Sequence, residues 1–240
     1  MDWQSIYRSR LVTADEAVRA IHSGNRIFLT GNCSIPQKLL QALIDYAPAL
    51  QDVEICHALT VSGSEYVMPE LAGHLRVNSL FISGNVRKAI QEGRADFTPV
   101  LLSEFPLLFK NGILPLDAAF VHLSPPDRLG YCTMGIESGL TRSAAESAKL
   151  IIAEVNQQMP RMHGDTLIHV SKLDYIVESD YPLAEIAMGG DDCDECTQKI
   201  AHFIADRIPD GATFQPGIGE IPNTVLRFLS DKKDLGIHAE

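Results

Sequence analysis

The sequence of 240 residues contains no apolar run that approaches the length of a membrane-spanning helix, which takes about 20 residues. Its first ten residues, MDWQSIYRSR, lack the apolar segment of a secretory signal peptide. Cysteine is sparse, and the five residues are scattered and odd in number, which does not suit a disulfide framework. We therefore expect a cytoplasmic protein with reduced thiols and no membrane partner.

Positive charge is also scarce, with 20 Lys and Arg against 31 Asp and Glu, a formal net charge of -11 and a pI of about 5.1. This balance argues against nucleic acid or an anionic membrane as the main partner. A small anionic ligand remains possible, because backbone N–H groups at a helix start bind phosphates without any net positive charge. Apolar residues make up 45%, an ordinary globular proportion.

Residue types that ligate metals are not gathered in a metal-binding pattern. The pair Cys193 and Cys196 is a single CxxC flanked by acids, and we interpret it as the start of a helix. His122 and His169 lie in apolar, strand-like runs, where hydrogen-bonded core histidines are commoner than ligands. No metal and no redox cofactor are expected.

Short apolar runs alternate with helical patterns along the chain. Strands are predicted over 26–31, 53–59, 75–83, 117–124, 150–156 and 212–217, and helices over 37–47, 85–93, 141–149, 196–208 and 223–233, with a further helix after a capping box at Thr13 and Glu16. This alternation predicts an α/β fold with an open, mainly parallel sheet and flanking helices. We interpret the Gly/Asp-rich segment 189–195 as a loop within one domain.

Ligands of open α/β sheets bind beyond the carboxyl ends of the strands. The loops at 31–36, 83–87, 124–131 and 215–222 are therefore candidates for a site. In the last of these, Gly217 and Gly219 precede a predicted helix start at Pro222, a place that could hold a phosphate or an oxyanion. The same pattern is also typical of a plain tight βα turn. Ser34 is either a helix cap or a contact to a bound acid or thiol.

Six ordered segments together resemble the acetyl-CoA hydrolase/transferase family, with the closest likeness to 4-hydroxybutyrate CoA-transferases. They are GNCSIPQKLLQAL, GNVRKAIQEGRADFTPVLLSEFPLLF, SPPDRLGYCTMG, AEVNQQMPRMHGDTLIHVSKLDYIVE, GIGEIP and LGIHAE. The resemblance implies the α/β fold of the NagB/RpiA/CoA-transferase group. It also implies transfer of CoA between an acyl-CoA and a short-chain carboxylic acid, with the CoA thioester as substrate and a homodimer or larger assembly.

The resemblance assigns the nucleophile to Glu240, which would form a glutamyl-CoA thioester. By the same resemblance, the N–H groups of Ile218 and Gly219, in the turn that Gly217 opens, would bind the oxyanion, and Gln215 would orient the glutamate or the acyl group. His238 lies two residues before Glu240 and would face the same side of an extended chain. Ala239 replaces the Thr or Ser usual before the glutamate in the family.

On this reading, residues 1–240 form the N-terminal CoA-transferase domain, ending at the nucleophile, and the family's C-terminal domain is absent from the chain. The chain alone is then expected to be inactive. Two alternatives remain open. One is hydrolysis of an acyl-CoA, and the other is a non-catalytic CoA-binding module or an inactive fragment.

Overall fold

The computed structural model describes residues 2–186 and 193–238. Contacts divide the chain into two compact units, Met1–Glu185 and Ile186–Glu240, each described here by itself. The boundary falls just before the 189–195 segment that the sequence analysis interpreted as a loop within one domain. The second unit has a small core of its own and does not extend the first sheet.

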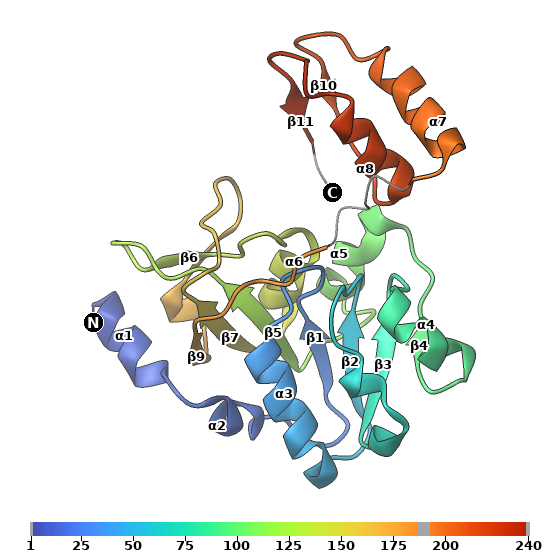
Figure 1. Ribbon diagram of the computed structural model, residues 1–240. Helices are drawn as coiled ribbons and strands as arrows, with labels where there is room; N and C mark the ends of the chain where they lie inside the picture. The colour runs from blue at the N-terminus through green and yellow to red at the C-terminus, as the bar shows by residue number, and fades with distance from the viewer. Residues whose placement is uncertain (1, 187–192, 239–240) are drawn as a thin grey trace. The chain divides into compact units, whose positions relative to one another are not determined.

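A seven-stranded sheet organises the first unit, with the order β4-β3-β2-β1-β5-β7-β9 (Figure 1). Every neighbouring pair in it is parallel, which confirms the predicted fold class. Its strands are β1 Arg26–Leu29, β2 Val53–His57, β3 Leu75–Ser79, β4 Asp96–Phe97, β5 Ala118–Leu123, β7 Leu150–Asn156 and β9 Tyr175–Ser179. A separate antiparallel pair is formed by β6 Tyr131–Thr133 and β8 Leu167–His169.

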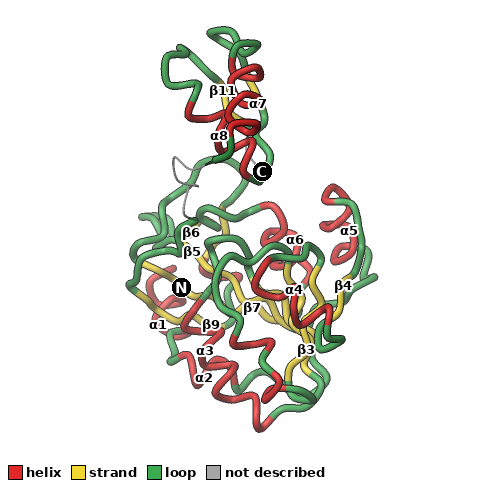
Figure 2. Tube along the Cα trace, turned by 45° about the vertical axis from the view of Figure 1, so that its right-hand side comes forward, coloured by secondary structure: helices red, strands yellow, loops and turns green. Residues whose placement is uncertain are grey.

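Helices cover both faces of this sheet, as the tube view in Figure 2 also shows. They are α1 Trp3–Arg10, α2 Ala14–Val18, α3 Gln37–Tyr46, α4 Gly84–Gln91, α5 Phe105–Lys110 and α6 Gly139–Ser147, with 3₁₀ turns at Ala47–Ala49, Glu65–Val67, Pro69–Leu71, Leu102–Glu104 and Val170–Lys172. One core cluster joins α2, α3 and α4 to one face, and a second joins α5 and α6 to the other. Alternate residues of a strand serve opposite faces, so Ile27 lies in the first cluster and Phe28 in the second.

The second unit contains α7 Glu195–Ala205, β10 Thr213–Phe214, α8 Glu220–Arg227 and β11 Gly236–Ile237. Its core is small and consists of Ala201, Ala205, Val225 and Leu229, with partly buried neighbours around them. β10 and β11 pair in parallel.

Most predicted elements are present, with shifted ends. The strand at 150–156 has the predicted bounds, and Thr13 and Glu16 form the predicted capping box. β3 stops at Ser79 instead of 83. α8 begins at Glu220 instead of 223, because Pro222 occupies its first turn, where proline costs no hydrogen bond.

The interior strand β5 is buried along its whole length, so its side chains should contribute strongly to the stability of the first unit. We expect Phe120→Ala, at a fully buried position, to lower the free energy of unfolding by about 3–5 kcal/mol. Ile113→Ala removes a large apolar side chain that is 63% exposed and should change it by under about 0.5 kcal/mol. Urea unfolding of both variants measures the difference, and equal effects would contradict this placement of the core.

Candidate functional site

The strand order places a topological switch point between β1 and β5. From β1 the chain passes through α3 to β2 on one side, whereas β5 lies on the other side and leads through α6 to β7. Ligands of such sheets bind in the crevice outside the carboxyl ends of the strands at this point. The predicted loops at 31–36 and 124–131 follow β1 and β5, and the 83–87 segment follows β3 at the same edge (Figure 1).

The loop after β1 starts with a close backbone approach. The N–H of Asn32 donates to the carbonyl oxygen of Leu59 at 2.6 Å, and Asn32 has a left-handed φ of 52°. A Cβ on Gly31 would overlap that same carbonyl oxygen, so only glycine fits here. Asn32 and Cys33 remain partly accessible beside the switch point.

Ser34 lies deeper in the same loop and is fully buried. It does not cap α3, because the helix starts three residues later with Pro36 at its N-cap, so that part of the prediction is wrong. Its Oγ has no hydrogen-bond partner among the described residues. A contact between Ser34 and substrate stays a prediction, and this buried side chain would have to be uncovered to make it.

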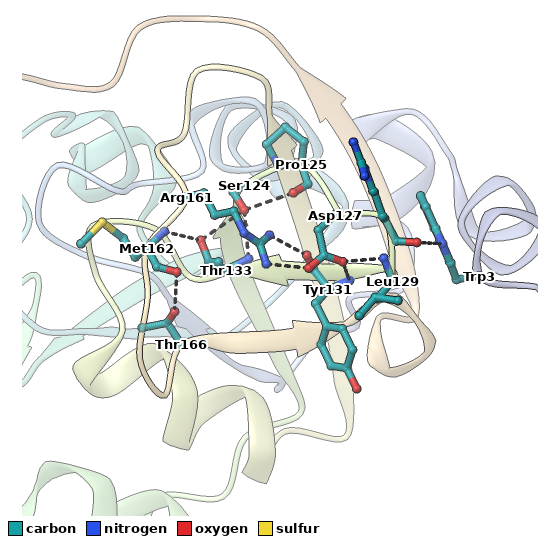
Figure 3. A network of polar contacts seen from close by, with 11 residues as sticks. Trp3, Ser124, Pro125, Asp127, Leu129, Tyr131, Thr133, Arg161, Met162 and Thr166 are labelled. Carbon is teal, nitrogen blue, oxygen red and sulfur yellow. Dashed lines mark hydrogen bonds and ion pairs between the residues drawn. The ribbon is translucent and has the colours of Figure 1, made fainter.

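The loop after β5 is held by Asp127 and Arg161 (Figure 3). One carboxylate oxygen of Asp127 accepts the N–H groups of Leu129 at 2.8 Å and Tyr131 at 3.0 Å. The other pairs with the Arg161 guanidinium at 2.7 Å, and Arg161 also donates to the carbonyl oxygen of Tyr131 at 3.0 Å. The N–H of Tyr131, with smaller effects from Leu129 and Arg161, lowers the pKa of Asp127 below its usual value.

Hydroxyl groups hold the base of this loop, and α1 holds it near its tip (Figure 3). Ser124 Oγ accepts the N–H of Thr133 at 2.9 Å, and Thr133 Oγ1 accepts the N–H of Met162 at 3.3 Å. The indole N–H of Trp3 donates to the carbonyl oxygen of Arg128 at 3.1 Å. The loop is therefore a braced structure whose tip, at Leu129, is 71% exposed.

Two helix starts beside the switch point are filled by buried carboxyl groups. Glu137 accepts the N–H of Leu140 at 3.2 Å and the hydroxyl of Thr141 at the start of α6. Glu154, on β7, accepts the N–H of Leu39 at the start of α3 at 3.0 Å. Burial raises the pKa of both carboxyl groups. Since these N–H groups already have acceptors, neither helix start is open to a ligand anion in this arrangement.

The histidines of this edge are buried and neutral. Burial lowers the pKa of His57 and of His122 to about 4. His122 Nδ1 donates to the carbonyl oxygen of Ser34 at 3.2 Å, as expected for a core histidine. His169 is only partly buried, and its Nδ1 bonds to the hydroxyl of Ser171 at 2.8 Å.

The turn between β10 and α8 is built on glycine. Gly219 is the N-cap of α8, with φ 135° and ψ -178°, a conformation open essentially only to glycine. Gly219 offers no side-chain acceptor to this helix, so an acceptor for its first N–H groups can come from a ligand. Ile218 is 60% exposed, and Gln215 follows β10 directly.

Pairing of β11 with β10 brings Ile237 and His238 to the same turn. Phe214 is the register partner of Ile237, and the N–H of His238 donates to the carbonyl oxygen of Phe214 at 3.0 Å. Gln215, Gly217, Ile218, Gly219 and His238 thus belong to one unit, whereas Ser34 belongs to the other. The predicted nucleophile, Glu240, lies outside the described residues.

Cys193 and Cys196 lie at the start of α7, where Asp194 caps the helix by accepting the N–H of Thr197 at 2.9 Å, which confirms the interpretation of that CxxC. Within residues 2–186 and 193–238, no group of three or more His, Cys, Asp or Glu is placed to hold a metal ion. No helix in this described part is long and apolar enough to cross a membrane.

Glu137, Glu154 and Arg161 were not among the site residues predicted from the sequence. A signal existed for Glu154, since a charged residue inside the apolar run LIIAEVN is unusual and must find polar partners when buried. Arg161 has no signal in the sequence, because its partners Asp127 and Tyr131 come from another segment. Glu137 bonds to residues three and four positions further on, but in a turn that follows no regular sequence pattern.

Comparisons with known proteins agree with these features. The family model described as acetyl-CoA hydrolase/transferase N-terminal domain matches residues 1–186. The chain is 44% identical over its whole length to a 4-hydroxybutyrate coenzyme A transferase of Clostridium kluyveri, of which it covers 56%. It is 40% identical over 94% of its length to a succinyl-CoA:acetate/propanoyl-CoA:succinate CoA transferase of Fasciola hepatica, of which it covers 47%.

Solved structures are similar along the whole chain. RipA from Yersinia pestis has a TM-score of 0.90 at 33% identity, and the chain covers 58% of it. A 4-hydroxybutyrate CoA-transferase from Porphyromonas gingivalis has a TM-score of 0.83 at 36% identity, with 56% of that chain covered. The chain thus spans about half the length of the relatives it matches.

The two glycines of the α8 turn should respond differently to a side chain. Gly219→Ala forces alanine into a conformation that costs about 1–3 kcal/mol, so α8 should lose protection from amide exchange. Gly217→Ala is the matched control, because Gly217 has no left-handed φ and a Cβ there would meet Pro222 at an ordinary 3.9 Å. Equal protection of α8 in both variants would contradict this backbone geometry.

Stability should fall on mild acidification because of the buried histidines. The folded-state pKa of His57 and His122 is about 4, below the usual 6.5, so the unfolded chain binds more protons between these values. Their contribution is complete above pH 6.5 and is lost as the pH falls to 4, up to about 3 kcal/mol per histidine. Glu137 and Glu154, with raised pKa values, act in the opposite sense: their contribution is present at low pH and is lost as the pH rises through those values.

Urea unfolding between pH 4 and 7, compared between two histidine variants, tests the histidine contribution. His122→Gln should flatten the dependence of unfolding free energy on pH, whereas His163→Gln, at an exposed position, should leave its slope unchanged. Parallel curves for the two variants would show that His122 titrates normally in the folded protein.

Proposed function

Because the chain belongs to the acetyl-CoA hydrolase/transferase family, we propose that it forms part of a CoA-transferase acting on an acyl-CoA and a short-chain carboxylic acid. The observation that carries this proposal is its identity of 44%, over the whole chain, to a 4-hydroxybutyrate coenzyme A transferase. Other matched relatives are likewise named as CoA transferases, for succinyl-CoA and for butyryl-CoA with acetate.

In the proposed reaction, the carboxylate of Glu240 attacks the thioester carbonyl and expels CoA as thiolate, which leaves a mixed anhydride. The thiolate then attacks the glutamyl carbonyl, releases the first acid and forms glutamyl-CoA. The acceptor carboxylate reverses these steps, so the whole cycle exchanges one CoA thioester for another of similar energy. This exchange between carboxylates uses the CoA thioester as substrate and calls for neither a metal nor a redox cofactor.

The uncapped start of α8 supports a role in this chemistry. Each tetrahedral intermediate carries an oxyanion that needs N–H donors aimed at it. We assign these donors to Ile218 and Gly219, because Ile218 is exposed and Gly219, the N-cap of α8, offers no side-chain acceptor. Gln215 and His238 would flank the nucleophile from the paired strands β10 and β11. A cytoplasmic homodimer is part of the same proposal.

The test uses the protein expressed from its complete reading frame. Wild type with acetyl-CoA and either butyrate or 4-hydroxybutyrate should yield the new acyl-CoA, and Glu240→Ala should lower kcat at least about a thousandfold. Glu195→Ala, which removes an exposed carboxylate at the start of α7, is the matched control and should keep wild-type activity. Chromatography of the CoA esters measures both.

Mass spectrometry of the enzyme mixed with acyl-CoA alone tests the intermediate. The expected result is a CoA adduct on the peptide that contains residue 240, present in wild type and absent in Glu240→Ala. Free CoA without new acyl-CoA would mean hydrolysis, and equal traces from wild type and Glu240→Ala would remove Glu240 from the mechanism.

A further inference from the structure

The start of α3 is capped by side chains from distant parts of the chain. Helices ordinarily begin with Ser, Thr, Asp or Asn at the N-cap, whose side chain accepts an N–H of the first turn. α3 has Pro36 there, which offers no side-chain acceptor. Instead, the N–H of Gln37 donates to the Tyr181 hydroxyl at 2.9 Å, 144 positions away, and the N–H of Leu39 donates to Glu154, 115 positions away.

The two distant caps are bonded to each other and to their surroundings. The Tyr181 hydroxyl donates to the second oxygen of Glu154. Asn156, on the same face of β7 as Glu154, fixes the backbone of Tyr181 by donating to its carbonyl oxygen at 2.9 Å and accepting its N–H at 3.3 Å. Glu154 and Asn156 therefore both serve Tyr181 and, through it, the start of α3.

This arrangement joins three segments at the carboxyl ends of the parallel strands. The 31–36 loop comes from β1, Glu154 from β7, and Tyr181 follows β9. His122, the register partner of Glu154 on β5, donates to the carbonyl oxygen of Ser34 in the middle of that loop. The loop is thereby attached to the sheet at both its centre and its end.

The cluster is costly for a purely structural core. Glu154 is fully buried. Lys38, in the first turn of α3, forms no hydrogen bond with the Glu154 carboxyl group; its ammonium group donates to the carbonyl oxygen of Glu178 at 2.9 Å. Ser34 Oγ, in the loop that this cluster holds, is buried without a hydrogen-bond partner among the described residues. An apolar residue at position 154 with an ordinary N-cap on α3 would avoid the cost of burying a carboxyl group.

We propose that Glu154 and Tyr181 are positioning residues, which hold the first turn of α3 and the 31–36 loop in the geometry that binds the acid substrate. The anchoring follows from the hydrogen bonds alone, and the consequence for substrate rests on the proposed function. Asn32 and Cys33, the accessible residues of the loop, are the parts whose placement this anchoring sets.

Amide hydrogen exchange of this chain tests the anchoring. Tyr181→Phe should speed exchange of the Gln37 and Leu39 amides about tenfold, since one hydrogen-bonded cap is lost and the other loosened. The amides of α4 provide the reference within the same protein and should not change. Tyr46→Phe removes a hydroxyl at the opposite end of α3 and is the matched control.

Steady-state kinetics of the protein from its complete reading frame test the role toward substrate. Tyr181→Phe and Glu154→Leu should raise the KM for the acceptor acid about five- to tenfold with kcat within about twofold. Glu154→Gln keeps an acceptor for the Leu39 N–H and should restore most of the wild-type KM. Because Glu154→Leu can also impair folding, the outcome is decided by Tyr181→Phe and Glu154→Gln.

The two arms separate the possible failures. Unchanged exchange at Gln37 and Leu39, or equally faster exchange throughout the sheet, would overturn the anchoring. Faster amide exchange confined to Gln37 and Leu39, together with an unchanged KM for the acceptor acid in an active enzyme, would overturn the positioning role. If wild type transfers no CoA at all, the proposed function fails, and the exchange arm still decides whether Glu154 and Tyr181 anchor the loop.

Discussion

The acceptors supplied to the first N–H groups of each helix decide where this protein can bind an anion. Every helix start leaves N–H groups that need acceptors, and a start already filled by a buried side chain has none to offer. Glu154 fills the start of α3 and Glu137 that of α6, although both helices flank the switch point of the sheet. The N-cap of α8 is Gly219, which offers no side-chain acceptor to the first N–H groups of that helix.

This constraint divides the work between the two units. At the edge of the first unit, carboxyl groups, hydroxyl groups and neutral histidines brace the loops after β1 and β5, which suits shaping a pocket more than binding charge. Asp127 and Arg161 neutralise each other there, and His57 and His122 stay uncharged at neutral pH. In the second unit, the glycine turn at the start of α8 suits the oxyanion binding that we propose for it.

Local patterns in the sequence were sufficient for the alternation of strands and helices, the parallel sheet and the loops at its carboxyl edge. A capping box at Thr13, a buried strand at 150–156 and a glycine turn at 217–219 are all decided by neighbours within a few positions. The caps of α3 could not be found this way, because their donors and acceptors lie more than a hundred positions apart. Ser34 was misjudged for the same reason: it looked like a local cap, while Pro36 and a remote carboxyl group determine where the helix starts. The division into two units near residue 185 was not predicted either, because the same alternation of strands and helices continues on both sides of it.

The most direct test of this account is an NMR titration of the chain with acetyl-CoA, following backbone amides at three helix starts. The account predicts concentration-dependent shifts for Ile218, Gly219 and Glu220, while the amides of Leu39 and Leu140, already bonded to Glu154 and Glu137, stay in place. Shifts at Leu39 and Leu140 with none in the α8 turn would contradict it and would move the anion-binding site to the switch point of the first unit.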